Sequence, residues 1–151
     1  MELLKSIVVD FVLFSSIEGF IFCLFFEKIG KCRKFKWYEW LILSIGNCLI
    51  SQLLPPLLYQ VVCIIWMALF IHFSNEKNIF DSVKLSFKSV IFFLVCEMLF
   101  AMFYDFILEL DFTNAKNIVV FIMTLPIRLV EIILIRRYKT MKIWIGGVVH
   151  K

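Results

Sequence analysis

The sequence contains few of the residues that mark loops, disorder or catalysis. Only five Gly, three Pro and two His occur among its 151 residues. Disordered and collagen-like chains are rich in Gly and Pro, so the composition excludes both classes. The sequence also has no His-Glu-x-x-His pair, no phosphate-binding Walker loop and no Gly-x-Ser-x-Gly elbow. We therefore expect a folded protein that is not an enzyme.

Cysteine is present but follows no recognisable pattern. The five thiols form no Cys-x-x-Cys pair and are odd in number, which argues against a disulfide framework or a zinc site; they are Cys23, Cys32, Cys48, Cys63 and Cys96. Most lie in apolar runs, where a free thiol behaves as a small hydrophobic side chain. Cys32 with His72 is the one pairing that a membrane peptidase could use, and no spacing supports it. The sequence predicts neither a metal nor a cofactor.

Long apolar runs dominate what is present. The chain is 62% hydrophobic with a mean hydropathy of +0.94, whereas soluble domains are about 45–50% apolar. A globular core of this size could not bury so much apolar surface, so we expect the lipid bilayer to be the solvent. The predicted fold class is all-α: a polytopic transmembrane helical bundle forming one integral membrane domain over residues 1–151. Despite the net charge of +4, nucleic acid is not an expected partner.

The apolar runs divide into about five predicted spans. About 20 residues of helix cross a hydrocarbon core, and the predicted spans cover residues 7–26, 40–54, 57–73, 90–110 and 118–135. Pro55 and Pro56 separate the second span from the third, because proline cannot continue a helix and restricts the residue before it. The two short arms either cross fully as a hairpin or form a shallow re-entrant pair.

The segments beside the spans are also distinctive. Residues 74–89 begin polar and then show apolar residues at helical spacing, which predicts a cytoplasmic interfacial segment leading into the fourth span. The basic run RRYKTMK is expected to end the fifth span, and the tail IWIGGVVHK to lie at the interface. The start MELLKSIVVDFVLF has no small-residue cleavage site, so we expect the first span to be retained.

Basic residues predict the orientation. Thirteen of the 16 Lys and Arg residues fall after the first span, after the third span, or in the C-terminal tail. Because Lys- and Arg-rich loops stay in the cytoplasm, the N-terminus is predicted outside and the C-terminus inside. The expected location is the cell membrane, as a multi-pass protein of a bacterial plasma membrane.

Three charged residues fall well inside the predicted spans. Counted from the outer end of each span at about 1.5 Å per residue, Glu18 lies about 17 Å deep, Glu97 about 20 Å and Arg128 about 15 Å. A lone charge at such depth costs at least about 2.5–3.5 kcal/mol. We therefore expect the three helices to meet through these residues.

The charged residues allow two interpretations. In the structural one, Arg128 pairs with Glu18 and Glu97 and holds three helices together. Glu131, three residues from Arg128, is a simpler local partner, and pairing with it would leave another carboxylate protonated or in a polar cavity. In the functional one, Arg128 binds an anionic group, or a carboxylate moves a proton or cation. Pro126 favours a site slightly, because a proline frees a backbone carbonyl.

The segment EGFIFCLFFEKIGKCRKFKWYEWLIL (Glu18–Leu43) resembles the membrane-sensor region of accessory gene regulator-type peptide-pheromone histidine kinases. The likeness lies in the topology and in the pattern of apolar spans and short loops, and it extends over Met1–Tyr138. It implies an outward N-terminus, a short basic loop after the first span, and a bundle that senses a peptide. Such sensors usually have more spans, followed by a helix with a phospho-accepting His and an ATP-binding domain. The resemblance therefore implies a sensor module without a kinase.

The leading hypothesis is a non-enzymatic membrane protein that senses or binds a ligand, plausibly a peptide, and signals through a protein partner or as a homo-oligomer. One alternative is a small transporter, or a transporter membrane subunit, with Glu18, Glu97, Arg128 and Glu131 as a midplane charged site. The other is a bacteriocin immunity or membrane assembly factor, which would act by occupying the surface of another membrane protein.

Overall fold

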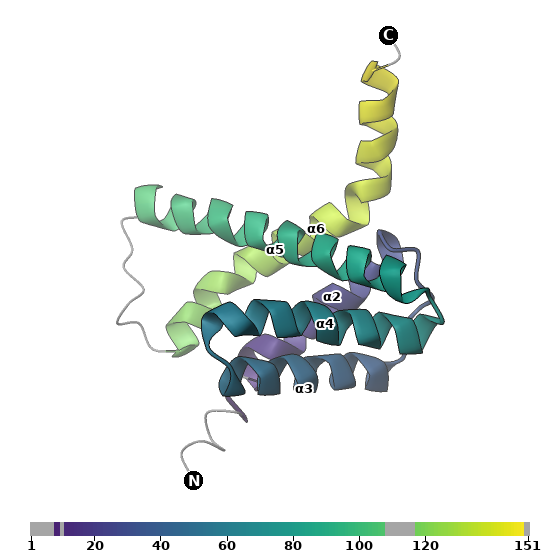
Figure 1. Cartoon of the computed structure of the whole chain (residues 1–151). Coiled ribbons are helices and arrows are strands. Elements are labelled where there is room, and N and C mark those ends of the chain that lie inside the picture. The colour runs from purple at the N-terminus through teal and green to yellow at the C-terminus, as the bar shows by residue number, and fades with distance from the viewer. Residues whose placement is uncertain (1–7, 10, 108–116, 150–151) are drawn as a thin grey trace.

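The chain folds into helices throughout the part that the structure describes. The structure is a computed structural model, and it describes residues 8–9, 11–107 and 117–149 (Figure 1). The elements are the π-helical turn η1 (Phe11–Ser15) and the α-helices α2 (Ser16–Lys28), α3 (Trp37–Leu53), α4 (Pro56–Asn75), α5 (Ile79–Ile107) and α6 (Asn117–Val149). No strand occurs in these residues. The predicted all-α class is therefore confirmed for them.

The break between α3 and α4 lies where the two prolines predicted it. Leu54 follows α3 in an extended conformation, and Pro55 is also extended, with ψ of 155°. Pro56 is the first residue of α4, where its missing N–H costs no helical hydrogen bond. The two helices consequently run back along each other as a hairpin.

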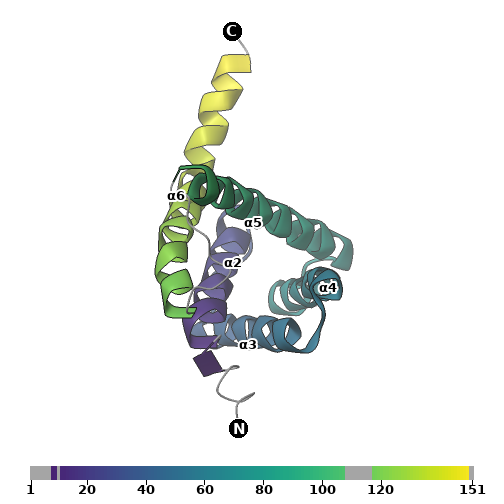
Figure 2. The ribbon, with the colours of Figure 1, turned by 90° about the vertical axis from the view of Figure 1, so that its left-hand side faces the viewer.

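The five α-helices pack as a ring. Each contacts the next from α2 to α6, and α6 closes the ring by packing on α2 (Figure 2). The α2–α3 and α4–α5 connections meet at one end of the bundle, whereas the α3–α4 turn lies at the other (Figure 1). We call the first end the basic end, because the residues in and beside its two connections include Lys28, Lys31, Arg33, Lys34, Lys36 and Lys77.

Aromatic side chains and small residues fill the bundle interior. Phe22 and Phe93 meet with ring centroids 4.4 Å apart, joining α2 to α5. Gly19 of α2 lies against Ser44 of α3, so closely that a Cβ on Gly19 would fall 2.0 Å from the Ser44 Oγ. Such close approach of backbones through small residues is typical of helices in membranes.

Within the described residues, two helices have the length and hydropathy needed to cross a membrane. They contain the windows Leu58–Asn75 in α4 and Ile79–Tyr104 in α5, with mean hydropathies of 1.6 and 1.9. Only 28% and 33% of the residues in these windows are buried inside the bundle. A core helix of a soluble protein would be mostly buried, so the apolar faces of α4 and α5 turn outward.

The last two helices extend beyond the predicted spans. Residues 79–89, expected as an interfacial helix leading into the fourth span, are the first turns of α5, which runs unbroken from Ile79 to Ile107 and buries three serines in the bundle, Ser82, Ser86 and Ser89. Past the expected end of the fifth span at RRYKTMK, α6 continues to Val149. Arg, Lys and Met are good helix formers, so a basic run can end an apolar span without ending the helix. Beyond it, the ribbon of α6 turns away from the bundle (Figure 1).

Candidate functional site

Helices α2, α5 and α6 bring four charged side chains together inside the bundle. Glu18 lies in the first turn of α2, Glu97 in the second half of α5, and Arg128 and Glu131 on one face of α6. Along the chain, Glu18, Glu97 and Glu131 are 110, 31 and 3 residues from Arg128, respectively. The four residues that the sequence singled out thus meet at one place, which we call the Arg128 cluster.

Arg128 contacts all three carboxylates at once. Its Nη2 lies 2.5 Å from Glu18 Oε1 and 3.2 Å from Glu97 Oε1. Its Nη1 donates to both oxygens of Glu131, at 3.2 and 3.1 Å. Arg128 therefore pairs both with the local partner Glu131 and with the two distant carboxylates, so both sequence-based alternatives apply at once. The planar guanidinium makes this possible because it presents several donors in a fixed fork.

The cluster has more carboxyl groups than cationic groups. With all groups ionised, three carboxylates face one guanidinium, which leaves a net charge of −2. The side chain of Glu131 is 0% exposed, Arg128 13%, Glu18 25% and Glu97 50%. Glu131 is thus fully enclosed, whereas Glu97 has a single contact with Arg128 and half of its surface free. The cluster has spare capacity to accept hydrogen bonds, and Glu97 is where that capacity is most accessible.

A cavity of about 100 Å³ lies beside the Arg128 cluster. All five α-helices contribute to its wall, whose polar residues are Glu18, Asn47, Tyr59, Gln60, Glu97 and Arg128. Apolar side chains such as Phe22, Met67 and Phe93 form the rest. Several water molecules or one small ligand group would fit in this volume. The cavity wall is therefore partly polar and partly apolar.

Sequence reasoning missed some of these wall residues. Asn47 lies on α3, and its Oδ1 accepts a hydrogen bond from the Cys63 Sγ on α4, at 4.0 Å. Tyr59 and Gln60 gave no signal of their own in the sequence. Both lie in the turn after Pro56, and their place on the cavity depends on how α4 is rotated in the bundle.

A second cavity, of about 230 Å³, lies between α5 and α6. It shares Glu97 and Arg128 with the first cavity, and its other wall residues are Ala101, Tyr104, Met123, Thr124 and Ile127. The Tyr104 hydroxyl donates to the Met123 carbonyl at 2.7 Å, three residues before Pro126. Pro126 itself lies inside the unbroken α6. The contact between Arg128 and Glu97 thus stands between two cavities.

A second arginine organises the basic end. The guanidinium of Arg33 binds the carboxylate of Glu39, and its Nε donates to the Ser74 carbonyl at 2.9 Å. Partial burial opposes ionisation of Glu39, but hydrogen bonds from Arg33 and the Lys36 N–H outweigh it and lower the pKa of Glu39. This network joins the two connections and stabilises the basic end.

His72 and Cys32 also lie at the basic end, both close to Lys77. The His72 Nδ1 donates to the Lys77 carbonyl at 2.5 Å. Burial raises the pKa of the Cys32 thiol, and the nearby Lys77 offsets only part of that effect. A thiol of this kind is a poor nucleophile at neutral pH. Among the described residues, no group of three His, Cys, Asp or Glu could hold a metal ion.

Comparison with known proteins gives no relative. No protein-family model, no curated protein and no solved structure matches the chain.

Proposed function

We propose that the chain is a multi-pass protein of the cell membrane, with five spans, an outer N-terminus and a cytoplasmic basic end. The outward apolar faces of α4 and α5 support a bilayer environment. The α2–α3 and α4–α5 connections, which carry most of the interhelical Lys and Arg, lie at the same end of the bundle. Positively charged loops on one face are typical of the cytoplasmic side.

Within this membrane protein, the Arg128 cluster is a ligand-binding site, and the protein is a non-enzymatic sensing module that acts through a partner protein. The observation that carries this proposal is that three carboxylates share one guanidinium, and that two of them, Glu18 and Glu97, lie on the wall of a cavity of about 100 Å³. A purely structural ion pair does not require three carboxyl groups for one guanidinium, and unpaired buried charge is costly. The site therefore suits a cationic group, such as the ammonium or guanidinium of a peptide side chain.

The bound group is small even if the ligand is large. A cavity of about 100 Å³ holds a single ammonium or guanidinium group and not a folded peptide. A peptide would therefore place one basic side chain in the cavity and leave the rest of its length outside. Glu97 is the natural contact for it, since its carboxylate is half exposed and weakly held.

The test uses methylammonium and guanidinium as probes of the purified full chain in neutral detergent. Both cations should raise the midpoint of thermal unfolding, whereas tetramethylammonium, which has no N–H group to donate to the carboxylates, should not. Glu97→Gln should abolish the effect, and Glu76→Gln, at the basic end, should leave it unchanged. Equal responses of the two variants would contradict the proposal.

A transporter is the second candidate, and the second cavity favours it. The cavities of about 100 and 230 Å³ meet at the contact between Arg128 and Glu97. Separation of these two side chains would join the cavities into one longer path through the bundle. Uptake of radiolabelled methylammonium by proteoliposomes decides between the candidates: transport by the wild type that is lost in Glu97→Gln would show that sensing is not the complete function.

A further inference from the structure

A pocket of about 340 Å³ opens at the basic end, far from the Arg128 cluster. It lies between the α2–α3 connection and the C-terminal end of α4, and its wall residues are Lys31, Arg33, Ser74, Asn75, Glu76 and Lys77. Three of the six are basic and one is acidic. Neither the proposed ligand site nor any pattern noticed in the sequence uses this pocket.

The walls of the pocket are fixed by hydrogen bonds. The Arg33 backbone N–H donates to Asn75 Oδ1 at 2.8 Å, and Lys77 Nζ donates to the Gly30 carbonyl at 2.5 Å. Lys31 and Glu76 adopt the left-handed conformation, with φ of 51° and 52°. This conformation is uncommon for residues other than glycine, so the two turns that frame the pocket are held by their surroundings.

The pocket wall includes a buried donor without an acceptor. Asn75 Oδ1 is occupied by Arg33, which fixes the orientation of the amide. The Asn75 Nδ2 is buried and has no hydrogen-bond partner in the described residues. Buried amide N–H groups almost always have an acceptor, so this one calls for an explanation. The ammonium of Lys77 has further N–H groups beyond the one given to Gly30, and Lys31 adds a second ammonium at the rim.

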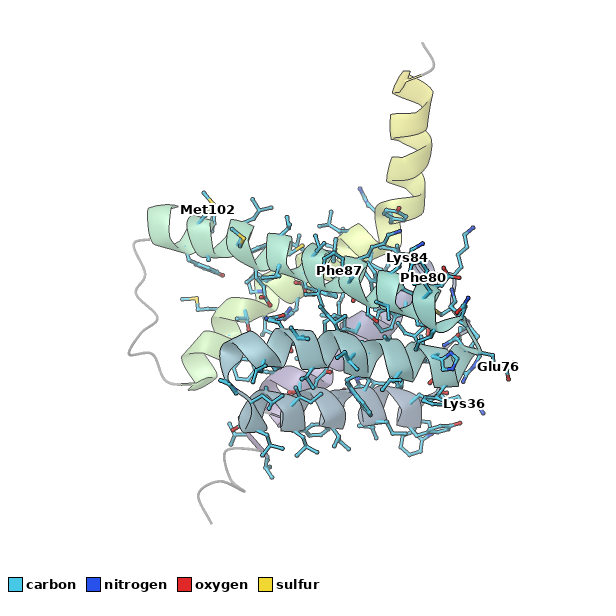
Figure 3. All side chains as sticks on the ribbon, in the orientation of Figure 1. Lys36, Glu76, Phe80, Lys84, Phe87 and Met102 are labelled. Carbon is cyan, nitrogen blue, oxygen red and sulfur yellow. The ribbon has the colours of Figure 1, made fainter. Side chains whose placement is uncertain are left out.

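Charge and surroundings indicate the missing acceptor. Arg33 is neutralised by Glu39, and the remaining Lys31 and Lys77 outweigh Glu76, so the ligand is an anion. Exposed aromatic residues surround this end, with Trp37 72% and Phe73 77% exposed, and Lys84 lies 4.5 Å above the Phe80 ring. Lys36, Glu76, Phe80 and Lys84 all gather there, away from Met102 (Figure 3). Aromatic and basic residues together are typical of the lipid headgroup level.

We propose that this pocket binds a phosphate group, supplied by the headgroup of an anionic phospholipid. A phosphate offers several acceptor oxygens, enough for Asn75 Nδ2 and both lysines. Basic pockets at the cytoplasmic ends of membrane helices are suited to such headgroups. The lipid as the source rests on the proposed membrane location, whereas the affinity for phosphate rests on the pocket alone.

The test measures binding to the purified full chain in neutral detergent and phosphate-free buffer, by native mass spectrometry and thermal unfolding. The probes are phosphatidylglycerol, phosphatidylcholine and inorganic phosphate. Phosphatidylglycerol should bind saturably and raise the unfolding midpoint, and the other two should bind about tenfold more weakly, because phosphatidylcholine adds a cation and free phosphate lacks the apolar anchor.

Asn75→Asp is the decisive variant. It keeps the Oδ1 that Arg33 needs and replaces the free donor with a carboxylate oxygen, so affinity for phosphatidylglycerol should fall by about tenfold or more. Lys77→Gln should weaken binding as well and serves if Asn75→Asp does not fold. Lys84→Gln, which removes a basic residue of the same end outside the pocket, should stay within about twofold of the wild type.

Three outcomes would overturn the proposal or part of it. Unchanged affinity in both Asn75→Asp and Lys77→Gln would show that the lipid binds elsewhere. Absence of saturable binding of any phosphate probe would refute the pocket. Inorganic phosphate binding as tightly as phosphatidylglycerol would retain the phosphate pocket and refute the lipid as its source. None of these outcomes bears on the cation site at Glu97.

Discussion

Two arginines in this molecule are held by carboxylates, and they are held in opposite ways. Arg128 lies inside the bundle, 13% exposed, between carboxylates from three helices. Arg33 lies at the basic end, 45% exposed, and binds one carboxylate six residues away together with backbone carbonyls. The contacts of Arg128 join three helices, and they involve more carboxylates than guanidinium groups. The contacts of Arg33 hold the connections at one end of the bundle, and they involve one carboxylate and one guanidinium. This difference is the basis on which we propose a ligand site at Arg128, whereas the contacts of Arg33 stabilise the connections at the basic end.

The largest difference is expected on removal of each arginine. Arg128→Ala leaves three carboxylates without the cation they share, at a cost of about 3–5 kcal/mol for a broken buried pair. The amount of folded protein in membranes, measured by size-exclusion chromatography of a fluorescent fusion, should fall severely. Arg33→Ala should cost roughly 1 kcal/mol or less, since an exposed pair contributes little. Similar yields of the two variants would remove the distinction between the sites.

The second effect concerns the packing that holds Glu18 in place. Gly19→Ala puts a methyl group where Ser44 Oγ lies 2.0 Å away, so α2 and α3 must separate at a cost of about 1–3 kcal/mol. The midpoint of thermal unfolding should fall. Adding Ser44→Gly returns the space, and the double variant should recover most of the loss. If it recovers none, the close approach of α2 and α3 does not explain the defect.

The carboxylates within the Arg128 cluster should differ among themselves. Glu131 is fully enclosed and accepts two hydrogen bonds from Arg128, so Glu131→Gln should destabilise by about 1–3 kcal/mol. Glu97 is half exposed in a cluster with excess negative charge, so Glu97→Gln should leave stability unchanged or raise it. Chemical denaturation in detergent measures both. The reverse order would mean that Glu97 is the structural partner of Arg128 and Glu131 the spare group.

The smallest effect is the pH dependence of the Arg33 network. Because its pKa is lowered from the ordinary 4.5, Glu39 stabilises the fold fully above pH 4.5, and this contribution is lost as pH falls through the lowered pKa. The unfolding midpoint of the wild type should exceed that of Glu39→Gln at neutral pH, and the gap should narrow below pH 4.5. A gap that widens in acid would contradict the assigned ionisation.

The sequence predicted the features that depend on composition and on single residues. The apolar runs predicted helices, and Pro55 and Pro56 predicted the break between α3 and α4, because proline acts locally. The meeting of Glu18, Glu97 and Arg128 followed from equal depth in antiparallel spans. Depth does not determine rotation about a helix axis, so the sequence could not decide whether Glu131 replaces or joins the distant carboxylates.

Features that depend on tertiary contact were missed. The pocket at the basic end joins residues such as Arg33 and Asn75, which are 42 positions apart, and each looks like an ordinary loop residue in the sequence. The burial of Ser86 in α5 was also missed. The large apolar residues of this segment lie on another face of the helix, and their pattern predicts burial of that face instead. The continuation of α6 shows that charge marks where an apolar span ends and not where its helix ends.

The membrane arrangement is the premise of the proposed function and of the lipid at the basic end, and fusions test it most directly. Alkaline phosphatase and green fluorescent protein would be joined after Lys31, Pro55, Lys77 and Thr140, each in a separate chain. The account predicts fluorescence and no phosphatase activity at Lys31, Lys77 and Thr140, and phosphatase activity without fluorescence at Pro55. Signals that place Lys31 and Lys77 on opposite faces of the membrane would contradict it.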